Sequence, residues 1–114
     1  SLPAEIQVLA FEGPLFFAGV EQMRRRIRAL AQKPGLVLDF SAVTMMDETG
    51  ALALGDFVQR LQAEGKRVYL AGLQRKPLRM LIRMGVVDRL GRRRVCKHLD
   101  SAVRRAVQEL GKEV

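Results

Sequence analysis

The fold is constrained most by one apolar stretch in which polar and apolar residues do not alternate. It predicts a strand, and the start of a helix follows it. Residues 36–40 read LVLDF, so apolar positions do not alternate with polar ones. A strand of this kind is typically buried on both faces, between layers of helix. Residues 41–46 are expected to form a loop, and Asp47, Glu48, Thr49 and Gly50 then open a helical pattern. The stretch therefore predicts the strand–loop–helix unit of an α/β fold.

Apolar residues recur at helical spacing in four segments of the chain. We expect helices over residues 19–32, 49–64, 77–85 and 99–110. In the third of these, Leu78, Leu81 and Ile82 are expected to face the core. Val86 and Val87 follow it and are expected to lead through Asp88 and Arg89 to a turn at Gly91.

Short apolar runs between the helices predict the sheet. We expect strands over residues 5–11, 15–17, 36–40, 67–71 and 92–96. Gly13 and Pro14 are typical of a turn, so the first two strands are expected to pair as a hairpin. Helices between the other strands imply right-handed crossovers. We therefore expect a single domain over residues 1–114 with a mixed, mostly parallel sheet of four to five strands and about four helices.

The rare reactive residues argue against catalysis and against a metal site. Cys96 is the one cysteine and His98 the one histidine. This excludes a disulfide framework and a zinc site built on cysteines. Cys96 and His98 would share a strand face, but a half-buried cysteine beside a surface histidine explains them better than a nucleophile–base pair. Neither a GxxxxGK nor a GxGxxG phosphate loop is present, so we expect no enzyme activity and no resident cofactor.

The strong positive charge narrows the range of partners. The net charge is +8, and 15 of the 20 basic residues are arginine. This charge favours an acidic protein, a phosphate-rich ligand or an anionic membrane face, although a solvated arginine-rich surface also explains it. No aromatic residues interleave the arginines, so we expect no specific nucleic-acid partner. No apolar run could span a bilayer. The chain starts at Ser1 without an initiator Met, so one expectation is a processed or excised piece, such as one domain of a longer protein.

Two groups of residues are candidates for binding. The first, which we name the strand–helix corner, comprises Ser41, Asp47, Glu48, Thr49 and Gly50. A helix start presents unpaired N–H groups and a positive dipole end, which suit an anion, a phosphoryl group or an acidic partner. Thr49 is the candidate phosphoacceptor, while helix capping alone also explains these residues. The second group is a candidate docking face of Met80, Arg83 and Met84, where exposed methionine beside arginine would make an adaptable surface.

The order of elements and two motifs resemble the STAS domain family. The stretches that carry the resemblance are residues 36–43 (LVLDFSAV), 46–51 (MDETGA), 68–72 (VYLAG) and 81–85 (LIRMG). The family includes bacterial anti-sigma-factor antagonists and the cytoplasmic C-terminal domains of SulP-type anion transporters. The antagonists typically read GxLD at the second strand, whereas residues 13–18 here read GPLFFA, which is similar to the transporter branch.

The resemblance implies a non-catalytic regulatory domain, in the cytoplasm at the inner face of the membrane. Its first partner would be the transmembrane domain of a SulP-type transporter, and its basic surface would lie near an anionic membrane face. The resemblance also implies weak nucleotide binding, or an acidic partner such as acyl carrier protein. The alternatives are a free-standing antagonist that docks on an anti-sigma factor and is switched at Thr49, or a nucleotide- or anion-sensing module. Glu48 replaces the serine common in the antagonists and places a negative charge beside that hydroxyl.

Overall fold

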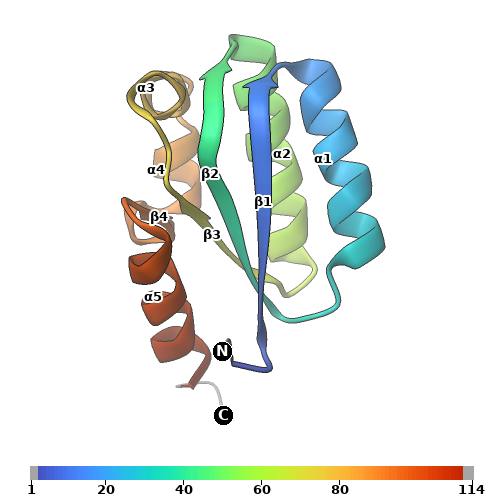
Figure 1. Ribbon diagram of the computed structural model, residues 1–114, viewed down its shortest axis with the longest axis vertical. Coiled ribbons are helices and arrows are strands. Elements are labelled where there is room, and N and C mark those ends of the chain that lie inside the picture. Colours follow the sequence, from blue (N-terminus) through green and yellow to red (C-terminus); the bar gives the residue numbers. More distant parts are fainter. Residues whose placement is uncertain (1–2, 112–114) are drawn as a thin grey trace.

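A four-stranded parallel sheet forms the middle layer of the computed structural model, which describes residues 3–111 (Figure 1). The strands are β1 (Ile6–Leu15), β2 (Gly35–Met46), β3 (Arg67–Ala71) and β4 (Val95–Cys96). They lie in the order β1-β2-β3-β4, and each neighbouring pair is parallel. Sequential parallel strands require a crossover between each pair, and here each crossover contains at least one helix.

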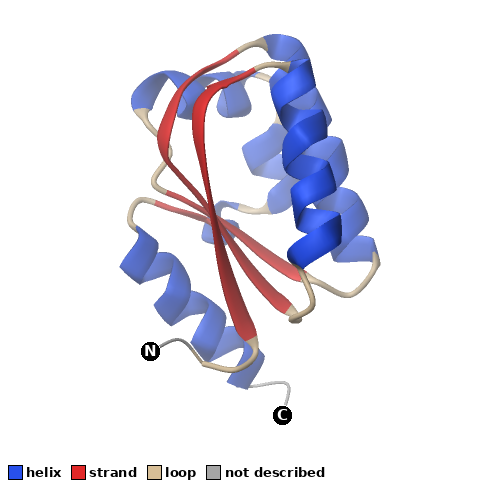
Figure 2. Ribbon diagram, turned by 45° about the vertical axis from the view of Figure 1, so that its right-hand side comes forward, coloured by secondary structure: helices blue, strands red, loops and turns tan. Residues whose placement is uncertain are grey.

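Five α-helices cover the sheet, four on one face and one on the other (Figure 2). They are α1 (Phe17–Leu30), α2 (Glu48–Ala63), α3 (Arg75–Arg83), α4 (Val86–Leu90) and α5 (Leu99–Gly111), and a 3-10 turn, η1 (Arg92–Arg94), precedes β4. Right-handed crossovers between strands in sequential order place all connecting helices on the same face. The C-terminal helix α5 is therefore left to cover the opposite face.

Each face of the sheet has its own core. The larger core joins α1, α2, α3 and α4 to the sheet through fully buried side chains such as Ile27, Leu54 and Leu81. The smaller core joins α5 to the sheet through Ala102 and Ala106. Because β2 lies between these two layers, polar and apolar residues do not alternate over residues 36–40, and the predicted burial of this strand on both faces is confirmed.

The predicted hairpin over residues 5–17 is wrong. Residues 6–15 form one continuous strand that pairs in parallel with β2, so all the described strand pairs are parallel rather than mixed. Gly13 and Pro14 are accommodated by register shifts between Ala10 and Glu12 and between Gly13 and Leu15. Proline is tolerated there because β1 is an edge strand whose outer side has no ladder to complete.

Three further boundaries differ from the sequence-based expectation. The loop expected over residues 41–46 is strand, because pairing of β2 with β1 continues to Met46. Val86 and Val87 begin the short helix α4, where no helix was expected, and both are buried. The strand expected over residues 92–96 is strand only at Val95 and Cys96, since the preceding arginines form η1.

Candidate functional site

The strand–helix corner lies at the tip of a two-stranded ribbon. The pairing of β2 with β3 ends at Asp39 and Ala71, whereas β1 and β2 continue side by side until Leu15 and Met46. The last residues of β1 and β2 therefore project beyond the rest of the sheet (Figure 1). Asp47 follows directly and begins α2, so the corner is held at one end of the molecule.

Asp47 is the N-cap of α2. Its backbone is extended, and its carboxylate accepts a hydrogen bond from the Gly50 N–H at 2.7 Å. The same carboxylate oxygen accepts one from the Thr49 hydroxyl at 3.1 Å. Asp47 thus satisfies one of the free N–H groups of the first turn and fixes the Thr49 side chain.

Gly50 is required because α2 begins in close contact with the end of β1. A Cβ atom at Gly50 would lie 2.4 Å from the Leu15 carbonyl oxygen, which is backbone and cannot rotate away. The glycine therefore allows the helix start to pack onto the ribbon. This gives the DETG stretch a structural role that does not depend on any ligand.

Thr49 and Glu48 are exposed at the surface, whereas Asp47 is half-buried. The N–H groups of Glu48 and Thr49 precede the first intrahelical hydrogen bonds and have no protein acceptor among residues 3–111. Those N–H groups and the helix dipole favour an anion there. Two carboxylates in the same turn oppose it, so the corner suits a hydroxyl-mediated or protein contact better than a free anion.

The corner also contacts the third helix of the large layer. Arg83 Nη2 of α3 lies 3.4 Å from Glu48 Oε1, and both side chains are largely exposed. The structure thereby brings together one residue of the strand–helix corner and one of the candidate docking face.

The other two members of the docking face are not freely exposed. Met80 and Met84 are half-buried and pack against the large core. Ile82, which was expected to face inward, instead has 53% of its surface exposed. That prediction is wrong because the helix places Ile82 beside Arg75 and Arg79 on the solvent side, and Leu81 on the core side. The exposed apolar residue of this face is an isoleucine rather than a methionine.

Ser41 is not part of the same constellation. It precedes Met46 by five residues of extended strand, which is a separation of about 16 Å. Its hydroxyl donates to Asp39 Oδ1, and its carbonyl oxygen accepts from Gln74 Nε2 at 2.8 Å. A Cβ atom at Gly72 would lie 2.3 Å from the Ser41 hydroxyl, so Ser41 is packed into the β3–α3 turn. Ser41 therefore fixes that turn rather than lining the corner.

Several apolar side chains near the corner are exposed, which the sequence pattern did not predict. Phe16 and Phe17 follow β1, Met45 lies at the end of β2, and Leu52 lies one turn into α2; each has between 41% and 55% of its surface exposed. Phe16 and Phe17 were assigned to a strand, where one of them would be buried. Their exposure follows from their place at the N-terminus of α1, where the N-cap Phe16 has no capping side chain. Large exposed apolar side chains of this kind mark contact surfaces.

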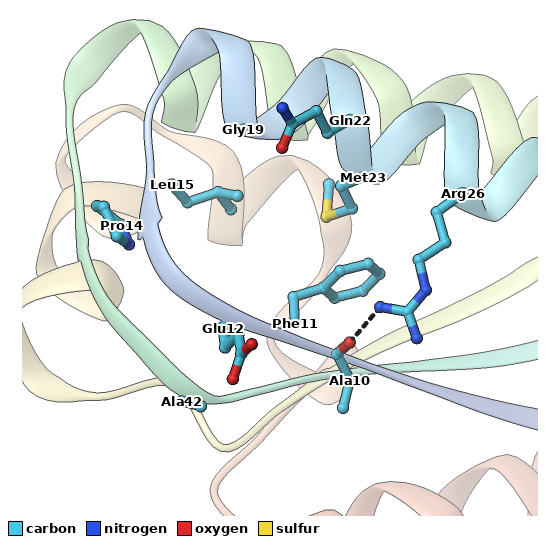
Figure 3. Close-up of a pocket in the computed structure, with 10 residues that line it drawn as sticks. All are labelled: Ala10, Phe11, Glu12, Pro14, Leu15, Gly19, Gln22, Met23, Arg26 and Ala42. Carbon is cyan, nitrogen blue, oxygen red and sulfur yellow. Dashed lines mark hydrogen bonds between the residues drawn. The ribbon is translucent and has the colours of Figure 1, made fainter.

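The hollow shown in Figure 3 lies between β1 and α1, and Thr49 is not among the residues that line it. It has a volume of about 500 Å³, and its apolar wall includes Phe11, Leu15 and Met23. Arg26 stacks over the Phe11 ring at 5.2 Å and donates to the Ala10 carbonyl oxygen at 2.7 Å. Because Ala10 lies on the edge strand, Arg26 covers part of the open edge of the sheet.

The remaining candidates for chemistry lie apart from the corner. Cys96 is buried at the edge of the small core and His98 is exposed, as expected for a structural cysteine and a surface histidine. Burial raises the pKa of the Cys96 thiol, which makes it a weaker nucleophile at neutral pH. Among residues 3–111, no three histidine, cysteine or acidic side chains lie together in a way that could hold a metal ion. Over the same residues, no helix has the length and apolar character needed to cross a bilayer.

Comparison with known proteins shows which family the chain resembles. The family model of the STAS domain matches residues 3–106. The protein YvdB of Bacillus subtilis (strain 168), named as a candidate sulfate transporter, is 27% identical over 97 residues; the match covers 83% of this chain and 18% of that protein. The chain therefore spans less than a fifth of the length of this relative.

Two solved structures extend the likeness to the whole fold. The STAS domain of a SulP transporter from Vibrio cholerae is 29% identical, with a TM-score of 0.81, over 98% of this chain and 88% of that one. A sulfate transporter family protein from Wolinella succinogenes is 25% identical, with a TM-score of 0.84, over 100% of this chain and 93% of that one. These similarities confirm the α/β fold that the sequence predicted.

Proposed function

Because the chain belongs to the STAS domain family, we propose that it is a non-catalytic regulatory and interaction domain, the cytoplasmic STAS module of a SulP-type anion transporter. The observation that carries the proposal is its similarity, over nearly its full length, to a STAS domain from a SulP transporter. The match to a fifth or less of a much longer candidate sulfate transporter supports the same placement. In this reading the domain works by docking, and the membrane-spanning part of the same protein is its first partner.

The geometry of the corner supports a docking role. The Asp47 and Thr49 side chains are held before any partner arrives, because one Asp47 carboxylate oxygen accepts from the Gly50 N–H and from the Thr49 hydroxyl. Preordered side chains lose little conformational entropy on binding. The exposed Phe17 and Leu52 add apolar contact area nearby. A partly apolar surface of this kind suits a protein partner.

The two ends of the sheet suggest how the domain is oriented. The amino end of β1 lies about 30 Å from the corner, given ten extended residues. In the SulP-type transporters that the chain resembles, the membrane domain precedes the STAS domain, so it would join ahead of β1. A hollow of about 380 Å³ at this end is lined by Gln62, Gly65, Lys66, Arg67 and Arg94. Lys66 and Arg67 would face an anionic leaflet, and the corner would face the cytosol.

Sequencing the gene that encodes the chain tests the proposal. We expect a single reading frame in which several membrane spans precede residue 1. A frame without spans would reject the transporter module and leave the family assignment intact. In the full-length protein, deletion of residues 3–111 should then alter anion uptake in vesicles while the membrane domain still inserts.

A second candidate is a phosphorylation switch at Thr49, which its exposure favours. A phosphoryl group there would lie beside Asp47 and Glu48 and would draw Arg83 from its present partner. Incubation with a cognate kinase, followed by mass spectrometry, should show modification of the wild type and none of Thr49→Val. A wild-type chain that stays unmodified would remove this candidate. Nucleotide or anion sensing has less support, because the two carboxylates oppose a bound anion.

A further inference from the structure

The helix α3 presents a row of cations and has no acidic residue of its own to balance their charge. Arg75, Arg79 and Arg83 are spaced four residues apart, so they follow one side of the helix, and all three are exposed. We name these three residues the α3 ridge. Lys76 is exposed beside them, and α3 contains no aspartate or glutamate.

Several arginines elsewhere in the described chain are paired with carboxylates. Arg24 pairs with Glu21 at 2.7 Å, and Arg28 pairs with Glu64 at 2.5 Å. On α3 only Arg83 has such a partner, Glu48, while Arg75 and Arg79 form no ion pair within residues 3–111. Arg25, Arg60 and Arg104 on other helices also form no ion pair within the described residues, but α3 is the one α-helix of that part of the chain that contains no acidic residue. Its row of cations therefore has no charge partner on its own helix.

This arrangement opposes the stability of α3 in two ways. Like charges four residues apart on a helix repel each other. Arg75 and Lys76 also lie in the first turn, where the helix dipole disfavours cations, and that turn contains no acidic residue. A helix of nine residues has little intrinsic stability with which to offset these effects. An acidic partner would relieve both.

The ridge also has an apolar neighbour. Ile82 lies on the same exposed side and is more than half exposed. A single aliphatic side chain beside a line of cations matches the face of an amphipathic helix, in which carboxylates recur every fourth residue next to an apolar position. Successive ridge residues are about 6 Å apart along the axis, which equals the spacing of such carboxylates.

We propose that the α3 ridge, with Ile82, is the docking site for an acidic amphipathic helix of a partner protein. The inference rests on the proposed role as an interaction domain and names the partner's chemistry. Carboxylates of the partner would face Arg75, Arg79 and Arg83, and an apolar residue would cover Ile82. Arg83 would be shared between the partner and Glu48, which links this docking site to the strand–helix corner.

An anionic bilayer is a poorer fit than a helix. Glu48, Asp56 and Asp88 are exposed on the neighbouring helices α2 and α4. A flat anionic surface would approach these carboxylates as well as the ridge, whereas a single helix can contact the ridge alone. The α3 helix also lies beside the projecting part of β2, away from the amino end of β1 (Figure 1).

The probe that tests this is a synthetic amphipathic helical peptide with glutamate at every fourth position and leucine beside that row. Binding to the ¹⁵N-labelled domain would be followed by NMR. We expect shifts in amides of α3 and of the first turn of α2, and binding that weakens as salt is raised. A peptide of the same composition with its glutamates spread around the helix should bind weakly. Equal binding of both peptides, or shifts centred on Arg24 to Arg28 or Arg92 to Arg94, would overturn the proposal.

Two variants with the same change of charge show whether the peptide binds at the α3 ridge. Arg79→Glu should weaken peptide binding by roughly tenfold or more, because it reverses the central cation of the ridge. Arg25→Glu on α1, which is also exposed, should leave binding within about twofold of the wild type, as expected for a distant surface charge. Circular dichroism would establish that both variants are folded, and Arg79→Gln provides a milder change if Arg79→Glu unfolds.

Vesicles containing phosphatidylglycerol distinguish the membrane alternative. Vesicle binding that is as strong as peptide binding and is lost in Arg79→Glu would overturn the assignment to a protein helix. No binding to these vesicles, together with peptide binding, would support it. Because these measurements use the isolated domain and the gene sequence tests the transporter assignment, either proposal can fail without the other.

Discussion

Arg83 Nη2 lies 3.4 Å from Glu48 Oε1, and this contact joins α3 to the first turn of α2. The two residues are 35 positions apart in the chain. The contact places a basic helix next to the capped helix start, so that one surface contains both candidate binding regions. Because both side chains are largely exposed, water and salt screen the pair.

The Glu48–Arg83 pair should contribute little to stability. We expect Glu48→Gln and Arg83→Ala each to change the free energy of unfolding by about 0.5 kcal/mol or less, with a coupling energy below about 1 kcal/mol in the double-mutant cycle. Urea unfolding of the four proteins measures this. A coupling energy well above that value would mean that the pair is a structural element rather than part of a docking surface.

The Asp47 cap should contribute more than the ion pair. Asp47→Ala removes the acceptor for the Gly50 N–H and for the Thr49 hydroxyl. The loss of an N-cap predicts a decrease of about 1 kcal/mol in the free energy of unfolding. Asp47→Asn is the matched control, because asparagine also caps helices and should recover most of the loss. An alanine variant as stable as the wild type would show that the cap is dispensable.

Substitution of Gly50 tests the close approach of α2 to β1. Alanine would favour the helix by about 1 kcal/mol through propensity alone. Its Cβ atom, however, would lie 2.4 Å from the Leu15 carbonyl oxygen, so backbone must shift. We expect this steric clash to outweigh the gain in helix propensity. Gly50→Ala should therefore destabilise the domain by about 1–3 kcal/mol, as overpacking usually does.

Gly111→Ala is the control for that experiment. Gly111 is the last residue of α5, and no atom lies within 4 Å of the position of its added Cβ. This variant should be neutral or slightly stabilising. If Gly50→Ala behaved in the same way, the ribbon and α2 would have room that the structure does not show.

Long periodic segments were predictable from the sequence because their burial repeats many times. The α2 stripe of Leu54, Val58 and Leu61 and the α5 stripe of Ala102, Ala106 and Leu110 fixed both helices to within two residues. The hairpin failed because Gly13 and Pro14 are local turn signals, and pairing of β1 with β2 outweighed them. Tertiary pairing routinely overrides local preference in this way.

The candidate site was predictable only where it depends on neighbours in the chain. Helix capping is local, so the sequence indicated it for the residues before the α2 stripe, and the structure assigns it to Asp47. The closeness of Gly50 to Leu15 and the pairing of Glu48 with Arg83 depend on how separate elements pack, which spacing along the chain cannot reveal. Ile82 was misplaced because α3 is short, and a few residues define the inward side of a helix poorly.

The ionisation of Tyr69 offers a test of how firmly α5 is attached. Burial raises the pKa of the Tyr69 hydroxyl, as does its hydrogen bond to the Glu109 carboxylate of α5. The tyrosine of the unfolded chain therefore ionises at lower pH than that of the folded chain. The free energy of unfolding should be unaffected at neutral pH and should fall as the pH rises above about 10.

Tyr69 is the one tyrosine and the chain has no tryptophan, so phenolate absorbance reports on this residue alone. We expect the phenolate signal to appear together with loss of the circular dichroism signal, not before it. Tyr69→Phe should show a weaker dependence of stability on pH in this range, which separates tyrosine from the lysines that also titrate there. Ionisation of Tyr69 near its ordinary pKa in a folded wild type would mean that α5 opens readily from the sheet.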